Sequence, residues 1–451
     1  MINTLYLPEL REMLAEKSAD QLGDFCTALH PARTAEFMEG LLDDEVFEVL
    51  SYAEPNVRTD IFSYFPLEKQ VSMIQSQDRR SVAELVADLA PDDRVDLLEE
   101  VNDKIVDEIL QLLPVEERRD IIRLRSYPED TAGAIMTTEV AKLDENLTVR
   151  EALDELARQS EELETIYYLY VVDQTDHLRG IVSARQLVSQ LAKSDTRLKD
   201  LMESDLSTVN VLDDQEEVAL KVAHYDLLAI PVVDAKQRLM GIITHDDVID
   251  VVREEATEDA HRIAGVDPLE QSYIKTNILT LSYKRGIWLT ILFCAALLTA
   301  YALGHYEESL AHTAWLKWFI PLVISTGGNS GSQSSTLVIT ALAMKDVRLH
   351  DWLLVIKREL QMGFLLGTML AAIGFVAAYF SLGTGSISDA LVIPITVLLV
   401  VVSGTLLGAT LPLLFLRLGL DPALMSSPFV AGIIDILGIV IYMNVALLML
   451  V

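Results

Sequence analysis

Asp435 is the only carboxylate that lies well inside one of the long apolar stretches in the second half of this sequence. It stands within PFVAGIIDILGIVIYMNV, a segment without Lys or Arg that could pair with its charge. An unpaired charge inside hydrocarbon is energetically expensive, and ionisable residues at such positions usually lie on an ion or proton pathway. We therefore interpret Asp435 as a pathway residue that attracts a cation. The alternative is a protonated Asp that only makes hydrogen bonds.

A second polar group interrupts another apolar stretch, where the sequence GGNSGSQ occupies residues 327–333. Glycine, hydroxyl and amide groups would weaken a helix that faces lipid, but they let backbones approach and supply oxygens to a pore. The side chains four residues apart, at 329 and 333, share one face of a helix. The candidate pathway residues here are Gly327, Gly328, Asn329 and Gln333. The alternative is a close helix crossing built from small residues.

The acidic residues outside these stretches form two runs that few lysines interrupt. In the first run, two turns of a predicted helix carry Asp92, Asp93, Asp96, Glu99 and Glu100. In the second run, carboxylates recur every three to four positions, at Asp247, Asp250, Glu254, Glu255, Glu258 and Asp259. Side chains at this spacing lie along one flank of a helix, where like charges repel. Hard divalent cations, which take oxygen ligands, would relieve this repulsion.

The charges are distributed unevenly over the 451 residues. The chain has 35 Lys and Arg against 68 Asp and Glu, a net charge of −33, yet the part after Leu281 holds eight of each sign. All the excess negative charge therefore lies in the first 280 residues, which excludes a nucleic-acid partner and favours cations. The two cysteines share no disulfide or metal-ligand spacing, and the N-terminus has no signal-peptide pattern. We expect the first half to stay in the cytoplasm.

Five apolar windows are long enough to cross about 30 Å of hydrocarbon as helices. They lie at 286–304, 318–343, 360–381, 391–416 and 428–450. Most Lys and Arg of the short loops fall on one side, which predicts a cytoplasmic N-terminus and an external C-terminus. Buried helices of a soluble core are the alternative. Glu359, beside Lys357 and Arg358 at the cytoplasmic start of the third window, forms either a surface ion pair or part of a pore mouth.

Two predicted domains of different structure precede these windows in the sequence. Up to about residue 130, prolines near helix starts recur every 23 to 25 residues, which predicts stacked helix pairs. The segment 131–255 twice repeats a capped helix, a β-rich run and a turn, strand and helix. Its second copy resembles a CBS domain, whose closing motif Gly241, Thr244 and Asp247 match. The first copy has Gln186 in place of the motif's acid.

The CBS resemblance implies a site for an adenosine nucleotide, with the hydroxyl of Thr244 and the carboxylate of Asp247 on the ribose. The sequence contains no P-loop and no dinucleotide-binding glycine pattern, so ATP would be a regulator and not a substrate. It also contains no nucleophile–base pair and no catalytic metal cluster. We therefore expect no enzyme activity.

In order, the sequence predicts an acidic all-α superhelical domain, an α/β pair of CBS domains, a connecting helix and a five-span α-helical transmembrane domain. Their expected bounds are 1–130, 131–255, 256–280 and 281–451. This multidomain membrane protein resembles the MgtE-type magnesium transporter family along essentially the whole chain. The most specific matches are GGNSGSQ, TEDAHRIAGVD, LGLDPAL and Asp435. The resemblance implies a homodimeric Mg²⁺ channel of the bacterial inner membrane.

The resemblance also implies a gating mechanism. By position, the family's regulatory Mg²⁺ ligands correspond to Asp60, Asp92, Asp96, Glu216, Asp226, Asp247, Asp250, Glu255, Glu258, Asp259 and Asp421. Acidic faces would separate when cytoplasmic Mg²⁺ is scarce, and bound Mg²⁺ would bridge them and close the pore. One alternative is a CBS-regulated secondary transporter of divalent cations coupled to protons or Na⁺, with Asp435 as the proton carrier. Another is a membrane-anchored nucleotide sensor.

Overall fold

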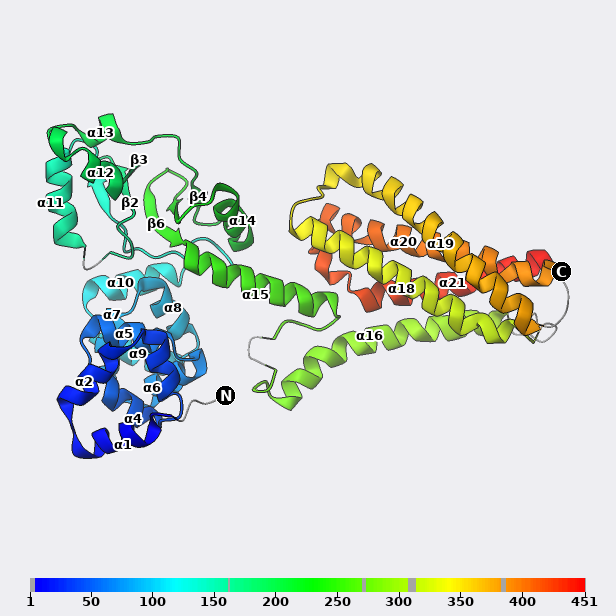
Figure 1. The fold of residues 1–451 in the computed structure, drawn as a ribbon, viewed down its shortest axis with the longest axis horizontal. Coiled ribbons are helices and arrows are strands. Elements are labelled where there is room, and N and C mark those ends of the chain that lie inside the picture. The colour runs from blue at the N-terminus through cyan, green and yellow to red at the C-terminus, as the bar shows by residue number, and fades with distance from the viewer. Residues whose placement is uncertain (1–4, 161–162, 270–272, 307–313, 383–386, 451) are drawn as a thin grey trace. The chain divides into compact units, whose positions relative to one another are not determined.

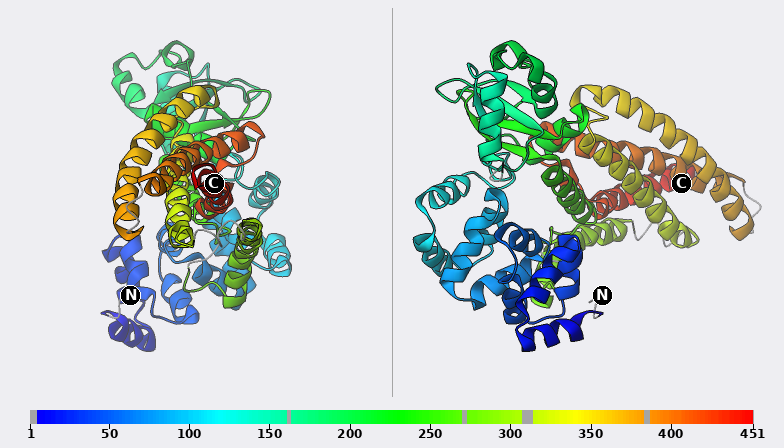
Figure 2. Two further views of the ribbon diagram at one scale, coloured as in Figure 1. Left: turned by 90° about the vertical axis from the view of Figure 1, so that its right-hand side faces the viewer. Right: turned by 60° about the vertical axis from the view of Figure 1, so that its left-hand side comes forward.

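The computed structural model of the chain describes residues 5–160, 163–269, 273–306, 314–382 and 387–450. It divides into two compact units, Met1–Val252 and Arg253–Val451. Figures 1 and 2 show short helices and small sheets in the first unit and long helices in the second.

Short helices make up the beginning of the first unit. Their bounds are α1 Leu7–Glu16, α2 Ala19–Ala28, α3 Pro31–Met38, α4 Asp43–Leu50, α5 Pro55–Ser63, α6 Leu67–Ser76, α7 Arg79–Asp88, α8 Pro91–Glu99, α9 Asp103–Leu112 and α10 Val115–Leu124. Proline lies in the first turn of α1, α3, α5 and α8, and directly precedes α6 and α10. A helix start tolerates proline because the N–H that it lacks would have no partner inside the helix. The prediction of helices that begin at prolines is confirmed.

Basic side chains in this stack cap the ends of earlier helices. Lys69 Nζ on α6 donates to three backbone oxygens at the end of α3, over distances between 2.9 and 3.3 Å. Arg94 on α8 donates to Leu89 O at 2.6 Å, and Arg118 on α10 donates to Leu113 O at 2.9 Å. The last carbonyls of a helix lack partners within it, so these bonds satisfy groups that would otherwise be exposed or unpaired. They also join α6, α8 and α10 to helices that precede them in the chain.

Two small sheets with the same topology follow in the described part of the first unit. The first contains β1 Lys142–Asp144, β2 Tyr168–Val172 and β3 Leu178–Ser183, and the second contains β4 Val209–Asn210, β5 Ala229–Val233 and β6 Leu239–Thr244. In each sheet the first strand is parallel to the second, and the second is antiparallel to the third. The accompanying helices are α11 Val149–Gln159, α12 Ala184–Ser189, α13 Leu198–Leu201 and α14 Gln215–Tyr225, with a 3₁₀ turn at Leu191–Lys193. This repetition agrees with the two CBS copies predicted from the sequence.

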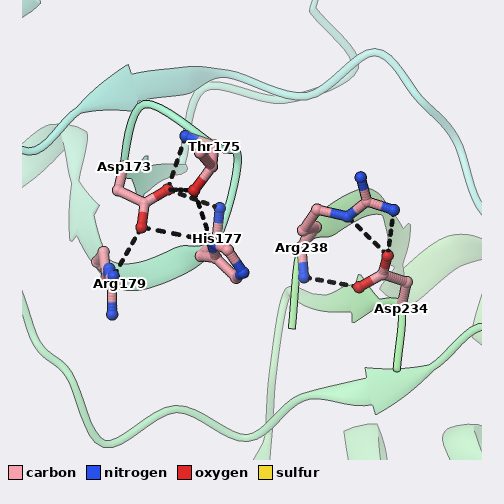
Figure 3. A network of polar contacts seen from close by, with 6 residues as sticks. All are labelled: Asp173, Thr175, His177, Arg179, Asp234 and Arg238. Atoms are coloured by element: carbon pink, nitrogen blue, oxygen red, sulfur yellow. Dashed lines mark hydrogen bonds and ion pairs between the residues drawn. The ribbon is translucent and has the colours of Figure 1, made fainter. Parts of the chain in front are cut away.

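Polar contacts close the hairpin turn of each sheet (Figure 3), and the two turns contact each other. Two backbone hydrogen bonds, of 3.0 and 2.9 Å, join them directly. Asp173 closes the first turn by accepting hydrogen bonds from Thr175 and from Arg179, the latter at 2.6 Å. Asp234 closes the second turn by accepting from Arg238 Nε at 2.8 Å. The paired turns therefore hold the two sheets together at their ends.

Helix α15 spans His245–Ile263. It begins and ends earlier than the connecting helix expected at 256–280. Gly265 follows the helix with a φ of +73°, and the N–H of Val266 donates back to His261 O at 3.0 Å. A glycine in this left-handed conformation is a common helix terminator because it has no side chain to clash with the backbone. The glycine of HRIAGVD therefore ends the helix.

Within the described ranges of the second unit, five helices have 24 or more residues. They are α16 Ile278–His305, α18 Leu316–Ala343, α19 Trp352–Leu382, α20 Ile387–Arg417 and α21 Ser427–Leu450. Among the residues described, four of these helices (α16, α19, α20 and α21) are long and apolar enough to cross a membrane. Helix α18 has the same length as α16 but carries the polar segment 327–333. The five expected windows correspond to these five helices.

Helices α18 and α20 cross at glycines. A Cβ atom on Gly408 would lie 2.3 Å from Gly331 O, and one on Gly404 would lie 2.9 Å from Gly327 O. A Cβ on Gly327 would in turn come within 2.5 Å of Val400 Cγ1. Only glycine lets two helix backbones approach this closely, so the glycines of both helices set the packing of the bundle.

Candidate functional site

Asp435 lies half-buried on α21 and faces the backbone of α18. A Cβ atom on Gly328 would be only 3.3 Å from Asp435 Oδ1, so the glycine leaves room for the carboxylate. In the part of the chain that the structure describes, no hydrogen bond or ion pair reaches Asp435. The carboxylate therefore retains its capacity to accept a cation or the water ligands of one.

The polar segment of α18 presents two different faces. Gly327 and Gly331 are buried against α20 and α21, whereas Asn329 and Gln333 are exposed. Asn329 Nδ2 lies 3.4 Å from Ser325 Oγ, and Gln333 lines an open hollow of about 430 Å³ with Ser332, Thr336 and Leu337. The close crossing of small residues is therefore present, and the pathway interpretation stays a prediction. The glycines of the segment form a close crossing, and its amides remain available to a pathway.

Hydroxyl groups of α18 hold the start of α21. Ser332 Oγ donates to Ser427 O at 3.0 Å, and Ser335 Oγ donates to Met425 O at 3.2 Å. Met425 lies in the turn before α21, and Ser427 is the first residue of the helix. Without the two serines, these backbone oxygens would need water as a hydrogen-bond partner. The serines of the segment therefore position the helix that carries Asp435.

Glu359 is a second carboxylate in the helix bundle, on α19. Its Oε2 accepts a hydrogen bond from Ser334 Oγ of α18 at 2.6 Å, and its backbone oxygen accepts one from Thr405 Oγ1 of α20 at 3.2 Å. The side chain is half-buried, and no ion pair with Lys357 or Arg358 forms among the described residues. The surface ion pair, one of the two alternatives for this residue, is therefore not seen in the described ranges. Three helices meet at this carboxylate, which leaves the pore-mouth interpretation as a hypothesis.

An acidic cluster forms in the first unit from segments that are far apart in the sequence. Asp92 and Asp93 come from α8, Glu164 comes from the loop before β2, and Asp247 comes from the first turn of α15. Thr244 Oγ1 donates to Asp247 Oδ2 at 2.5 Å. Within the described residues, Asp92 Oδ1 is buried and has no hydrogen-bond partner. The cluster thus contains carboxylate oxygens that a cation could use.

Burial and mutual repulsion raise the pKa of each acid in this cluster. The pKa of Asp92 lies well above its ordinary value, first because of burial and then because of Asp247. Burial raises the pKa of Asp247 to about 6, and burial together with Asp247 raises the pKa of Glu164 to about 7. Asp250 contributes to the raised pKa of Asp93. The ionised cluster is unfavourable unless a cation compensates its charge.

Four other predicted ligands of the first unit lie on α5, on α8 and at the two ends of α14. Asp60 lies on α5, where burial raises its pKa. Asp96 is exposed on α8, one turn beyond Asp92. Glu216 lies in the first turn of α14, and Asp226 ends that helix with a φ of +51°. Their assignment as Mg²⁺ ligands remains a prediction.

A second acidic group lies in the second unit, where the end of α15 meets the α20–α21 loop. Arg262 forms ion pairs with Glu258, one turn earlier, and with Asp421 in the loop. Burial raises the pKa of Asp259, Asp421 raises it further, and Arg262 lowers it. Glu255 lies one turn before Glu258 and is half-buried. The expected ligands Glu258, Asp259 and Asp421 are thus close together, with a guanidinium among them.

Comparisons with known proteins agree with this arrangement. Residues 29–130 match the model of the MgtE intracellular N domain, and residues 132–193 and 198–254 match that of the CBS domain. Residues 320–445 match the MgtE model, described as a divalent cation transporter. The magnesium transporter MgtE of Thermus thermophilus is 35% identical over 444 residues, which cover 98% of either chain. The chain belongs to the MgtE family.

Other MgtE proteins are similar in sequence and in the fold of the cytosolic part. The magnesium transporter MgtE of Enterococcus faecalis is 33% identical over 89% of this chain and 95% of its own. The solved soluble part of a magnesium transporter superposes with a TM-score of 0.52 at 35% identity, over 55% of this chain and 97% of that one. The cytosolic domain of the Mg²⁺ channel MgtE, solved in complex with ATP, gives 0.50 at 33% identity, over 54% and 98%.

The MgtE acids are suited to a hydrated divalent cation. In the described residues, no group of three or more His, Cys, Asp or Glu side chains is arranged as a ready metal site. Mg²⁺ dehydrates reluctantly and is usually held by one or two carboxylates while it keeps several waters. Pairs such as Asp92 with Asp247, or Asp259 with Asp421, can supply such ligands without a complete protein cage.

The expected nucleotide residues of the MgtE chain are already engaged with each other. Thr244 is buried and donates its hydroxyl hydrogen to Asp247, which also faces the acidic cluster. A ribose hydroxyl and a cation would therefore compete for one carboxylate. The hydroxyl of Tyr170, fully buried between the two CBS copies, has no hydrogen-bond partner in the described residues.

Sequence reasoning missed Glu164 and Arg262 in this MgtE chain. Glu164 lies in EELETIYY, where nothing in the local pattern separates it from neighbouring surface acids. Arg262 lies at i+4 from Glu258, a spacing that predicts a helical ion pair and could have identified it. Its second partner, Asp421, is 159 residues away, so no local pattern could identify that contact.

Proposed function

We propose that the chain is a channel that takes up Mg²⁺ across the bacterial inner membrane and that cytoplasmic Mg²⁺ closes. The observation that carries this proposal is Asp435, a carboxylate without a protein partner in the described residues, set against the backbone of α18. The names of the relatives, magnesium transporters at 35% and 33% identity, support it. Asn329, Gln333 and Glu359 are the further pathway candidates, and Gly327 and Gly328 provide the space beside them.

In the proposed topology, α16, α18, α19, α20 and α21 all cross the membrane. The N-terminal helices and the CBS pair lie in the cytoplasm, and the C-terminus lies outside. The distribution of Lys and Arg over the short loops supports this orientation. Helix α18 is less apolar than the other four because its serines and amides face neighbouring helices or the pathway.

The proposed assembly is a homodimer. Helix α16 has no buried residue, although it is one of the apolar helices. Polar side chains also lie exposed on α18, at Asn329 and Gln333, where lipid would be an unfavourable neighbour. A second copy of the chain could cover both faces and enclose a pathway between two Asp435 side chains.

Closure follows from electrostatics in this proposal. Burial, and after it repulsion from neighbouring acids, raises the pKa of Asp92 and Asp247, so their ionised forms are unfavourable when no cation is present. Mg²⁺ between them removes the repulsion and stabilises the contact between the N-terminal helices and the CBS pair. A second set, Glu258, Asp259 and Asp421, would bind Mg²⁺ where α15 meets the membrane unit.

Ion flux into liposomes that contain the purified chain tests the function. Asp435→Asn keeps the size of the side chain and removes its charge, so Mg²⁺ influx should fall at least about tenfold. Asp346→Asn, at an exposed carboxylate of the same unit, is the matched control and should conduct normally. Unchanged flux in Asp435→Asn would remove this residue from the pathway. No Mg²⁺ flux in the parent protein would refute the function itself.

A secondary transporter coupled to protons or Na⁺ is the second candidate. Asp435 and Glu359 are half-buried carboxylates in the bundle, the type of group that carries protons in coupled transport. The same liposomes distinguish the two candidates. Influx driven by a Mg²⁺ gradient alone, with protons and Na⁺ equal on both sides, identifies a channel, whereas a requirement for either gradient identifies coupling.

ATP is the proposed regulatory nucleotide, bound at the CBS pair through Thr244 and Asp247. The relative solved with ATP and the buried hydroxyl of Tyr170 between the CBS copies support this proposal. Titration calorimetry with ATP in EDTA and in Mg²⁺ tests it. Thr244→Val should weaken ATP binding, and equal affinity would contradict the assignment.

A further inference from the structure

Arg262 occupies the centre of the acidic group where α15 meets the α20–α21 loop. Its guanidinium forms ion pairs with Glu258 through Nη2 and with Asp421 through Nη1. Its charge also acts on Asp259, whose ionised form it favours. Three carboxylates therefore surround one permanent positive charge, because an arginine side chain does not lose its proton in proteins.

The contact is anchored on both sides. Asp421 is fixed in the loop because its Oδ1 accepts a hydrogen bond from Ala423 N at 2.7 Å. On the helix side, Ile263 packs against an apolar cluster that contains Met425. Beyond it, a Cβ atom on Gly265 would lie 3.4 Å from Ser426 Oγ. The ion pairs of Arg262 therefore lie beside a close apolar contact.

Charge and exposure determine what this arginine can do. The side chains of Arg262, Glu258 and Asp421 are 33%, 27% and 31% exposed, so the ion pairs are shielded only in part from water. Three carboxylates and one guanidinium leave an excess of two negative charges, which one divalent cation would neutralise. Without the guanidinium the excess would be three, and docking of α15 on the loop would bring uncompensated acids together.

We propose that Arg262 is a tethered counterion that holds the end of α15 on the α20–α21 loop when no divalent cation is bound. Mg²⁺ then completes the neutralisation of Glu258, Asp259 and Asp421 and does not have to create the contact. This inference rests on the proposed gating by Mg²⁺. Arg262 is a positioning residue, since it contacts Glu258 and Asp421 and acts through these acids.

Two consequences distinguish a counterion from a side chain that only supports the fold. Loss of the arginine should release α15 in EDTA, while saturating Mg²⁺ should restore docking because the cation replaces the missing charge. The closure of the channel should also depend more steeply on Mg²⁺, since more positive charge must then come from bound ions. A purely structural defect would persist in Mg²⁺.

Thiol labelling of the full-length protein measures the docking directly. Ser426 is fully buried beneath Gly265, and its hydroxyl has no hydrogen-bond partner in the described residues, so Ser426→Cys is a conservative reporter. The exposed Cys294 is replaced by Ser. Cys26 is kept, because burial raises the pKa of its thiol to about 11 and makes it unreactive. The rate of maleimide labelling is compared in EDTA and in saturating Mg²⁺.

The variants are Arg262→Gln, Arg262→Lys and the control Arg417→Gln, which removes an exposed charge four residues before Asp421. In EDTA, Arg262→Gln should label about five to ten times faster than the parent, as expected for two partly exposed ion pairs in one network. Arg262→Lys should label at a rate between those of the parent and Arg262→Gln, because it keeps the charge but has one nitrogen in place of the two that reach Glu258 and Asp421. Arg417→Gln should label at the parent rate. In Mg²⁺ all four proteins should label slowly.

Equal labelling of Arg262→Gln and the parent in EDTA would overturn the inference. Fast labelling of Arg262→Gln that Mg²⁺ fails to slow would also overturn it, since the arginine would then have a structural role only. These outcomes do not depend on transport. Absence of Mg²⁺ flux in liposomes would refute the proposed function, while the labelling rates would still decide the role of Arg262.

Discussion

Replacing Asp247 with Asn should stabilise the first unit when no divalent cation is present. Burial, and repulsion from Asp246 and Asp93, raise the pKa of Asp247 from 3.8 to about 6. A carboxyl group whose pKa is higher in the folded state binds its proton more tightly there than in the unfolded chain. Stability is therefore greatest at low pH, falls as the pH rises from about 4 to about 6, and stays low above that.

The size of the effect follows from the shift. An increase from 3.8 to about 6 corresponds to roughly 3 kcal/mol at 1.36 kcal/mol per pKa unit. Glu164, with a pKa raised from 4.5 to about 7, extends the fall to neutral pH. The two shifts share a common repulsion and do not add in full. For a unit of this size, about 3 kcal/mol corresponds to a change in Tm of roughly 5–10 °C.

Thermal unfolding of the fragment 1–263 measures this prediction, since the soluble part of a relative has been solved by itself. In EDTA, the parent fragment should lose roughly 5–10 °C in Tm between pH 4 and pH 8, and Asp247→Asn should lose less than the parent. Mg²⁺ should raise the Tm at pH 8 more in the parent than in the variant. Asp195→Asn, at an exposed acid, is the control. A parent Tm that is constant from pH 4 to pH 8 in EDTA would refute the reasoning.

Three further changes test the packing. Gly408→Leu should prevent assembly of the helix bundle, because even a Cβ atom there would lie 2.3 Å from Gly331 O. Size-exclusion chromatography in detergent would reveal aggregation of this variant. A normal elution profile would contradict the close crossing of α18 and α20. Lys69→Met should destabilise the first unit by about 1–3 kcal/mol through three uncapped carbonyls, measured by urea unfolding. Glu359→Gln can still accept the hydrogen bond from Ser334, so it should fold normally; unchanged Mg²⁺ flux would exclude a role for its charge in the pathway.

The sequence predicts a helix or strand well where neighbouring residues alone determine its start or end. The prolines of the N-terminal domain lie at helix starts because their missing N–H is tolerated there. The closing motif at Thr244 and Asp247 likewise starts α15 through a local hydrogen bond. The connecting helix was expected at 256–280, whereas α15 ends at Ile263. The acidic run stops at Asp259, and Gly265 ends the helix with a positive φ.

The tertiary contacts of the candidate sites could not be predicted from the sequence in the same way. The segment 327–333 allowed either a crossing or a pathway, and only the partner glycines of α20 assign Gly327 and Gly331 to the crossing. The sequence allowed Glu359 either a surface ion pair or a place in a pore mouth, and it could not predict the hydrogen bond from Ser334 on α18. Such choices depend on residues more than 20 positions away, which neither periodicity nor charge spacing encodes.

The continuity of α15 has a mechanical consequence. Its 19 residues extend for about 28 Å at 1.5 Å per residue, with Asp247 in the first turn and Arg262 in the last. A stiff rod of this length converts a tilt of about 10° at one end into a displacement of roughly 5 Å at the other. A tilt at the first turn of α15 would therefore move Arg262 by about that distance. A glycine in place of Thr257 would weaken the helix between these two ends and reduce the displacement.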